Sequence, residues 1–213
     1  MLELGVKTLL AYLLGSVSGS LLLGQLRGVD IRTLGSGNAG GTNALRTQGA
    51  GFAFCVMVID IGKGWLAAAW LPGSGFPIID PDPAIDRSWL MIACAAAAVV
   101  GHVYPVWYGF RGGKGAATLV GVMIGLKPMA LAPVLIVWLG VVMLTGYVGL
   151  ATMLAVAAFP IYIAIATGEF STALFTFGCV MLLFVCYTHR SNIERMRAGV
   201  ENRAQRLWLL RPR

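Results

Sequence analysis

The sequence predicts an all-α, polytopic integral membrane protein with about seven transmembrane helices, and three observations support this fold class. First, 58% of its 213 residues are hydrophobic and only 12% are charged, which is too little charge to cover the surface of a soluble globule. Second, the apolar residues stand in continuous runs near the length that crosses a bilayer. Third, these runs lack the alternation of polar and apolar residues that the strands of a membrane barrel show.

The apolar runs define the predicted spans. We place them at residues 4–25, 51–71, 88–108, 116–126 with a short extension, 129–147, 150–167 and 171–188. The fourth run covers only about 17 Å, at about 1.5 Å per residue, before Lys127 and Pro128 interrupt it. An arrangement with five or six spans therefore stays open.

Charges in the connections orient the predicted helices. If the N-terminus lies outside, 12 of the 16 Lys and Arg residues fall on the inner side. Inner connections of membrane proteins carry such an excess, so the pattern predicts an outer N-terminus and an inner C-terminus for an odd number of spans. We expect one domain over residues 1–213, whose last part, 195–213, is a basic interfacial tail resting on anionic lipid.

Several classes of protein are excluded by this composition. A soluble enzyme, a disordered chain and a free nucleic-acid binder do not fit, despite the net charge of +7. The four cysteines lie inside apolar runs without metal-binding spacing, so neither a metal nor a cofactor is indicated. Glu3 stands where a signal peptide carries basic residues, and we expect the first run to be a retained span.

A polar, glycine-rich loop follows the first predicted span and reads GSGNAGGTNALR over residues 35–46. Glycines let successive backbone N–H groups converge on one anion, and a helix that begins after the loop favours negative charge. Arg46 adds a planar, charged fork that suits phosphate. The predicted anion-binding set is Ser36, Gly37, Asn38, Thr42, Asn43 and Arg46. A flexible turn between helices is the alternative.

A second glycine-rich loop, in the segment GHVYPVWYGFRGGKGAAT of residues 101–118, precedes the fourth run. Its predicted anion-binding residues are Gly112, Gly113, Lys114 and Gly115; the alternative is a basic turn. Nucleotide hydrolysis is not indicated, because the Walker A spacing fails. The first loop also matches the spacing of the dinucleotide fingerprint, but it follows a predicted span instead of a strand.

Polar residues within and at the ends of spans complete the candidate set. Asp60 and Lys63 are three residues apart inside the second span, so we expect them to pair on one helix face, either as a structural pair or with Lys63 turned toward the anion site. Thr152 is a weaker candidate, because hydroxyls often cap helices. His189 and Asn192 share a helix face after the last span, where we expect them to meet both glycine loops.

The motifs together resemble those of the membrane acyl-phosphate:glycerol-3-phosphate acyltransferase family, commonly called PlsY. The resemblance runs nearly end to end and rests on GSGNAGGTNALR, GHVYPVWYGFRGGKGAAT and HRSNIERM, with DIGKG in the second span as support. It implies a seven-helix bacterial inner-membrane enzyme with its active site on the cytoplasmic side. Such an enzyme transfers a fatty acyl group from acyl phosphate to the 1-hydroxyl of sn-glycerol 3-phosphate and yields lysophosphatidic acid.

The resemblance also implies roles for particular residues. It assigns the first motif to glycerol-phosphate and phosphate binding, and it places the family's closing histidine and asparagine at His189 and Asn192. The family's third motif usually has serines where this chain has Gly149 and Thr152, so a role at Gly149 is restricted to its backbone. A soluble enzyme that produces acyl phosphate is an expected partner, beside membrane lipid.

The expected chemistry needs no protein nucleophile, because acyl phosphate already carries a good leaving group. We expect Arg46 and Lys114 to neutralise the two phosphates, and His189 or a substrate phosphate oxygen to take the proton. The alternative from another class is a transporter of a small phosphorylated anion. Such a protein needs polar groups along a path through the membrane, and within the spans only Asp60 and Lys63 qualify.

Overall fold

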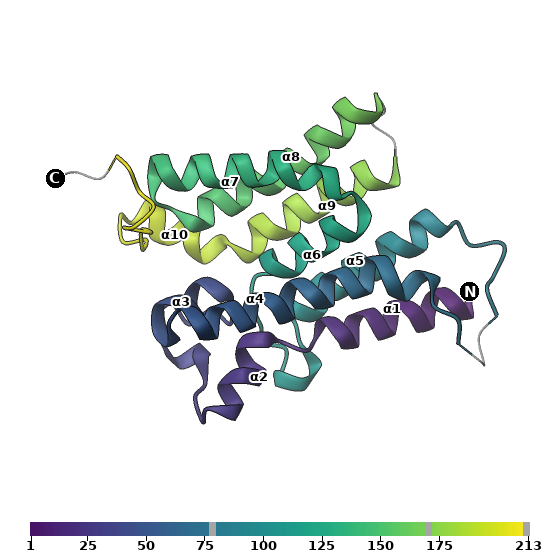
Figure 1. The fold of residues 1–213 in the computed structure, drawn as a ribbon, viewed down its shortest axis with the longest axis horizontal. Coiled ribbons are helices and arrows are strands. Elements are labelled where there is room, and N and C mark those ends of the chain that lie inside the picture. Colours follow the sequence, from purple (N-terminus) through teal and green to yellow (C-terminus); the bar gives the residue numbers. More distant parts are fainter. Residues whose placement is uncertain (77–79, 169–171, 211–213) are drawn as a thin grey trace. The chain divides into compact units, whose positions relative to one another are not determined.

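The computed structural model describes residues 1–76, 80–168 and 172–210, and its regular elements are helices (Figure 1). The chain divides into two compact units, Met1–Pro128 and Met129–Arg213. The single domain expected from the sequence stays a prediction. The main helices of the first unit are α1 (Leu2–Gly15), α2 (Gly19–Leu26), α3 (Gly41–Gln48), α4 (Ala50–Trp65), α5 (Arg87–Val103) and α6 (Ala116–Leu126). Those of the second are α7 (Leu131–Thr145), α8 (Val148–Thr167), α9 (Ala173–Thr188) and α10 (Arg190–Arg197).

Short helical turns connect or extend these helices. They are η1 (Ile31–Thr33), the π-helical η2 (Leu66–Trp70), η3 (Leu71–Gly73), η4 (Val106–Tyr108) and η5 (Pro128–Ala130). The π-helical turn and η3 continue α4 directly, so that one apolar helical segment runs from Ala50 to Gly73.

The prediction of an all-helical membrane chain is confirmed in its coarse form. Within the described ranges, four segments are long and apolar enough to cross a membrane, and two bent helix pairs raise this number to as many as six. The four segments are Ala50–Gly73, Arg87–Tyr108, Pro128–Thr145 and Val148–Thr167. The short α6 matches the weak fourth span, with only 11 residues. The total of seven spans and their orientation stay predictions.

Two sequence predictions fall partly outside the described residues. The last predicted span begins at residue 171, which lies in the undescribed range 169–171. The final residues of the predicted tail, 211–213, are not described either.

The first predicted span, residues 4–25, is broken in the structure. Helices α1 and α2 meet at an angle of 47°, because Ser18 is extended between them and the Ser16 hydroxyl donates back to the carbonyl of Tyr12 at 2.9 Å. The break removes Val17 and Gly19 from the regular helical ladder. Their carbonyl and N–H groups bond instead to Lys63 and Asp60.

Glycines let two pairs of helices in the first unit come into backbone contact. In the pair α1 and α5, a side chain on Gly15 would collide with the carbonyl of Ala98. In the pair α4 and α6, a side chain on Gly121 would collide with the carbonyl of Ile61. Small residues at such crossings supply the close packing that holds helices together in lipid, where the hydrophobic effect does not.

The second unit packs α8 between α7 and α9 and folds the end of the chain back onto them. The rings of Phe159 and Phe177 meet edge to face, with centroids 6.3 Å apart. Beyond α10, the N–H of Ala204 donates to the carbonyl of Gly146 at 2.8 Å, and that of Leu209 donates to Met143 at 2.9 Å. The described part of the tail therefore covers the turn between α7 and α8, and its contact with lipid stays a prediction.

The glycine crossing of α4 and α6 predicts a selective loss of stability. Gly121→Ala should destabilise the protein by about 1–3 kcal/mol, because the methyl group overpacks the crossing. Gly140→Ala is the matched control, since a side chain there meets nothing within 4 Å. Thermal unfolding in detergent measures both variants, and equal midpoints would contradict the role of the crossing.

Candidate functional site

The first glycine-rich loop is held together by the side chain of Asn43 at the start of α3. Its amide nitrogen donates to the carbonyls of Leu34 at 2.9 Å and Ile31 at 3.2 Å, and its oxygen accepts the N–H of Ser36 at 2.9 Å. Asn43 is buried. It therefore fixes the shape of the loop, and the direct substrate contact predicted for it stays a prediction.

Glycine is required where this loop turns. Gly35 has a φ of 57°, in the left-handed region, and a side chain there would collide with the amide oxygen of Asn43. The loop then enters α3, as the sequence predicted, and exposes the side chains of Thr42 and Arg46. Arg46 stands in the last turn of α3, and its exposed guanidinium can bind an anion from water.

The second glycine-rich loop is anchored to the end of α5. The N–H of Gly112 donates to the carbonyl of Val103 at 3.0 Å, and the N–H of Gly113 donates to the backbone carbonyl of His102 at 3.1 Å. These bonds engage the N–H groups of both glycines within the protein, and the anion contact predicted for them stays a prediction. Gly115, with a φ of 88°, begins α6.

The two glycine loops lie side by side in the first unit. A side chain on Gly113 would come within 2.6 Å of the carbonyl of Ala39 and would overlap the ring of His102. Gly113 thus fits between one loop's backbone and a histidine ring, which is possible only without a Cβ atom. The two loops are therefore neighbours within the first unit, and their joint binding of substrate stays a prediction.

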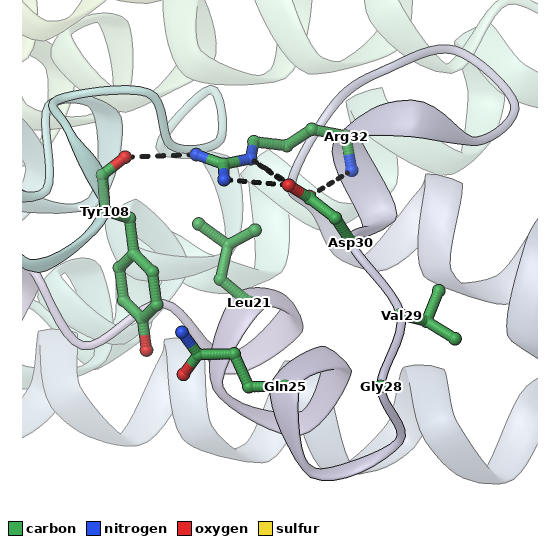
Figure 2. A pocket seen from close by; sticks show the side chains of 7 residues that line it. All are labelled: Leu21, Gln25, Gly28, Val29, Asp30, Arg32 and Tyr108. Atoms are coloured by element: carbon green, nitrogen blue, oxygen red, sulfur yellow. Dashed lines mark hydrogen bonds and ion pairs between the residues drawn. The ribbon is translucent and has the colours of Figure 1, made fainter.

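An arginine clasp joins the two segments that lead into these loops. Figure 2 shows the guanidinium of Arg32 between Asp30 and the backbone of Tyr108. Its Nη2 lies 2.8 Å from the Asp30 carboxylate, and its Nη1 donates to the carbonyls of Tyr108 at 3.0 Å and Arg111 at 3.1 Å. Arg32 was not among the predicted residues, although it lies only three residues before the first loop.

A pocket of about 310 Å³ opens beside this clasp. Its lining residues are Leu21, Gln25, Gly28, Val29, Asp30, Arg32 and Tyr108 (Figure 2). The fork of Arg32 is occupied by Asp30 and by two carbonyls, so its contribution to this pocket is to hold the wall in place.

The predicted pair of Asp60 and Lys63 is present, and His102 joins it. The ammonium of Lys63 lies 2.8 Å from Asp60 Oδ1 and 2.9 Å from His102 Nδ1, and it donates to the carbonyl of Val17 at 2.7 Å. These contacts engage Lys63 inside the protein, and the phosphate contact predicted for it stays a prediction. The role of His102 was missed, because sequence spacing does not reveal a contact between α4 and α5.

Asn192 is oriented within the second unit. Its amide nitrogen donates to Glu201 at 2.7 Å, and the other oxygen of Glu201 lies 2.6 Å from Nε of Arg195. A side chain on Gly149 would come within 2.9 Å of the Asn192 amide, so glycine lets α8 lie close to Asn192 here. The Thr152 hydroxyl donates to the carbonyl of Val148 at 2.9 Å.

His189 is buried at the bend between α9 and α10, where the helices meet at 54°. Its Nδ1 lies 2.9 Å from the carbonyl oxygen of Val185. A carbonyl oxygen only accepts, so Nδ1 carries the proton of the neutral ring and Nε2 is the nitrogen able to take one. His189, Asn192 and Thr152 belong to the second unit, and their predicted meeting with the glycine loops stays a prediction.

Apolar helices of spanning length, glycine crossings and a buried ion pair define a helical integral membrane protein. Residues 6–199 match the model of a family described as glycerol-3-phosphate acyltransferase. Glycerol-3-phosphate acyltransferase of Chlorobaculum tepidum is 39% identical over 91% of this chain and 93% of its own length. That of Geobacter sulfurreducens is 38% identical over 93% and 96%. The chain belongs to the glycerol-3-phosphate acyltransferase family, as its motifs predicted.

Solved structures agree with this assignment. The crystal structure of PlsY (YgiH), an integral membrane glycerol 3-phosphate acyltransferase, in its glycerol 3-phosphate form has a TM-score of 0.80 and 31% sequence identity, over 94% of both chains. The lysophosphatidic acid form of that protein gives a TM-score of 0.78.

The clasp predicts a dependence of stability on pH. Hydrogen bonds from the side chain and backbone N–H of Arg32 lower the pKa of the Asp30 carboxyl. A lowered pKa in the folded state stabilises the protein above about pH 4, and this contribution is lost as the pH falls through the folded-state pKa. Asp30→Asn should therefore lower the unfolding midpoint by up to about 2–4 °C at pH 7, and the difference from wild type should shrink in acid.

The effect is small, because Asp30 is partly exposed to water. Arg32→Lys serves as the reciprocal variant, since lysine has no planar fork with which to bond a carboxylate and two carbonyls at once. A deficit of Asp30→Asn that persists unchanged at pH 3 would mean that its carboxylate does not stabilise the clasp.

Proposed function

We propose that this chain is a bacterial inner-membrane acyltransferase that moves a fatty acyl group from acyl phosphate to the 1-hydroxyl of sn-glycerol 3-phosphate. The products are 1-acyl-sn-glycerol 3-phosphate and phosphate, in the first acylation step of phospholipid synthesis. The observation that carries the proposal is family membership over residues 6–199. The glycerol 3-phosphate and lysophosphatidic acid forms of the similar PlsY structure support the acceptor and the product.

The adjoining glycine loops support a site for two phosphorylated substrates. Arg46 is exposed on α3, and Lys114 stands between Gly113 and the start of α6. Each cation neutralises one phosphate in this proposal, and together they hold the acceptor hydroxyl near the acyl carbonyl. Such positioning can supply about 7–11 kcal/mol of the barrier in well-oriented systems.

The reaction then proceeds without a covalent enzyme intermediate. The 1-hydroxyl oxygen attacks the acyl carbonyl carbon, the bond from that carbon to the phosphate oxygen breaks, and phosphate departs with the electron pair. The hydroxyl proton goes to Nε2 of His189 or to a substrate phosphate oxygen. Cations and backbone donors stabilise the negative charge that develops on the carbonyl oxygen and on the leaving group.

The proposed topology has seven spans, with α6 as the short fourth one, an outer N-terminus and an inner C-terminus. Most basic residues, including those of both glycine loops, then face the cytoplasm, as the charge bias of inner connections favours. A cytoplasmic site would take glycerol 3-phosphate from water and leave the acyl product in the bilayer. A soluble acyl-phosphate-producing enzyme would deliver the donor.

A direct assay tests the function. Purified protein in detergent, given palmitoyl phosphate and glycerol 3-phosphate, should form the monoacyl product without a thioester. Parallel reactions with palmitoyl-CoA and with the palmitoyl thioester of acyl carrier protein serve as donor controls. Product only with a thioester donor, or with none of the three, would reject the proposed acyl-phosphate reaction.

A histidine variant tests the proton acceptor. His189→Gln should lower kcat by about 10²–10⁴-fold, because glutamine retains a hydrogen-bond donor but cannot take the proton. Thermal unfolding of the variant shows whether the fold is retained. Turnover near that of the wild type would instead assign the proton to a substrate phosphate.

A further inference from the structure

Asp60, Lys63 and His102 form a buried polar cluster in contact with the second glycine loop. Their exposed fractions are 0%, 3% and 2%. The cluster draws on three parts of the first unit, since Asp60 and Lys63 come from α4, His102 from α5, and the N–H of Gly19 at the start of α2 donates to Asp60 at 3.0 Å. Its groups are therefore fixed relative to several helices at once.

The contacts of the Lys63 ammonium fix the orientation of the His102 ring. An ammonium group has three hydrogens and can only donate, and the acceptors here are Asp60 Oδ1, the Val17 carbonyl and His102 Nδ1. Because Nδ1 accepts from Lys63, the proton of the neutral ring is on Nε2. The ion pair thus sets both the tautomer and the direction of the ring.

The other edge of the His102 ring contacts the glycine loop. Nε2 lies against Gly113, where a side chain would overlap it, and the carbonyl of Ala39 limits Gly113 from another side. The backbone carbonyl of His102 also accepts the N–H of Gly113 at 3.1 Å. A rotation of the ring would therefore displace Gly113, which directly precedes Lys114.

We propose that the Asp60–Lys63–His102 cluster is a positioning unit for the second glycine loop. It orients the His102 ring, and through Gly113 it sets the loop from Lys114 to Gly115 for a substrate phosphate. That this loop binds a substrate phosphate rests on the proposed function. A buried ion pair adds little net stability compared with apolar side chains of similar volume, so we assign its main effect to geometry.

The test uses the double variant Asp60→Asn/Lys63→Met in the full-length protein. Removing both charges avoids an unpaired buried charge, which a single substitution would leave. Hydrogen exchange of the peptide segment 109–116 should become at least about tenfold faster, because the His102 ring loses its fixed direction. With palmitoyl phosphate and glycerol 3-phosphate, the KM of one substrate should rise roughly 10- to 100-fold, with little change in kcat.

The matched control is Glu3→Gln/Lys7→Met. Lys7 is another buried lysine, paired with Glu3 at 2.8 Å and donating to the Pro72 carbonyl at 2.7 Å. It resembles Lys63 in burial and bonding but is engaged with another part of the first unit. This variant should leave both the exchange of segment 109–116 and the KM values unchanged.

The outcomes separate positioning from stability. A lowered unfolding midpoint with unchanged loop exchange and KM would overturn the inference, as would equal effects in the control. If the double variant does not fold, His102→Gln takes its place with the same expected pattern, and failure of both to fold would also overturn it. If the wild type makes no acyl product, the proposed function fails, while the exchange measurement still decides the positioning claim.

Discussion

The buried ammonium group of Lys63 needs three acceptors, and this need explains how several helices of the first unit are arranged around it. Lys63 lies in an apolar helix, where an unsatisfied charge is costly, and its acceptors come from a broken helix, its own helix and a neighbouring one. The break between α1 and α2 supplies a carbonyl that a continuous helix would have used internally. The break between α1 and α2 thus exposes the carbonyl acceptor that makes a buried charge in α4 possible.

The close approach of backbone segments is the second constraint, and it affects both the packing of helices and the position of a loop. Gly15 and Gly121 bring helices into contact, while Gly113 brings a loop onto a histidine ring. In lipid, contact between helices depends on close packing, so the glycines that shape the helix pairs also determine where the loops between them lie. The many glycines of this chain therefore serve rigid contacts as well as turns.

The sequence predicted the features that depend on local spacing. These include the helical class, most helix positions, the pairing of Asp60 with Lys63 and the glycine loops before α3 and α6. It missed features that depend on contacts between distant segments, such as the clasp of Arg32 and the place of His102. The sequence alone does not distinguish two uses of Asn43, because an amide that suits phosphate is equally suited to the backbone carbonyls it binds here.

The bond between Asn192 and Glu201 has a consequence for the order in which the protein matures. Asn192 lies in α10, but the carboxylate that holds its amide is nine residues further along the chain. Ribosomal synthesis adds residues from the N-terminus, so α10 is complete before the group that aligns its asparagine exists. The alignment of Asn192 therefore follows the synthesis of the apolar helices that precede it.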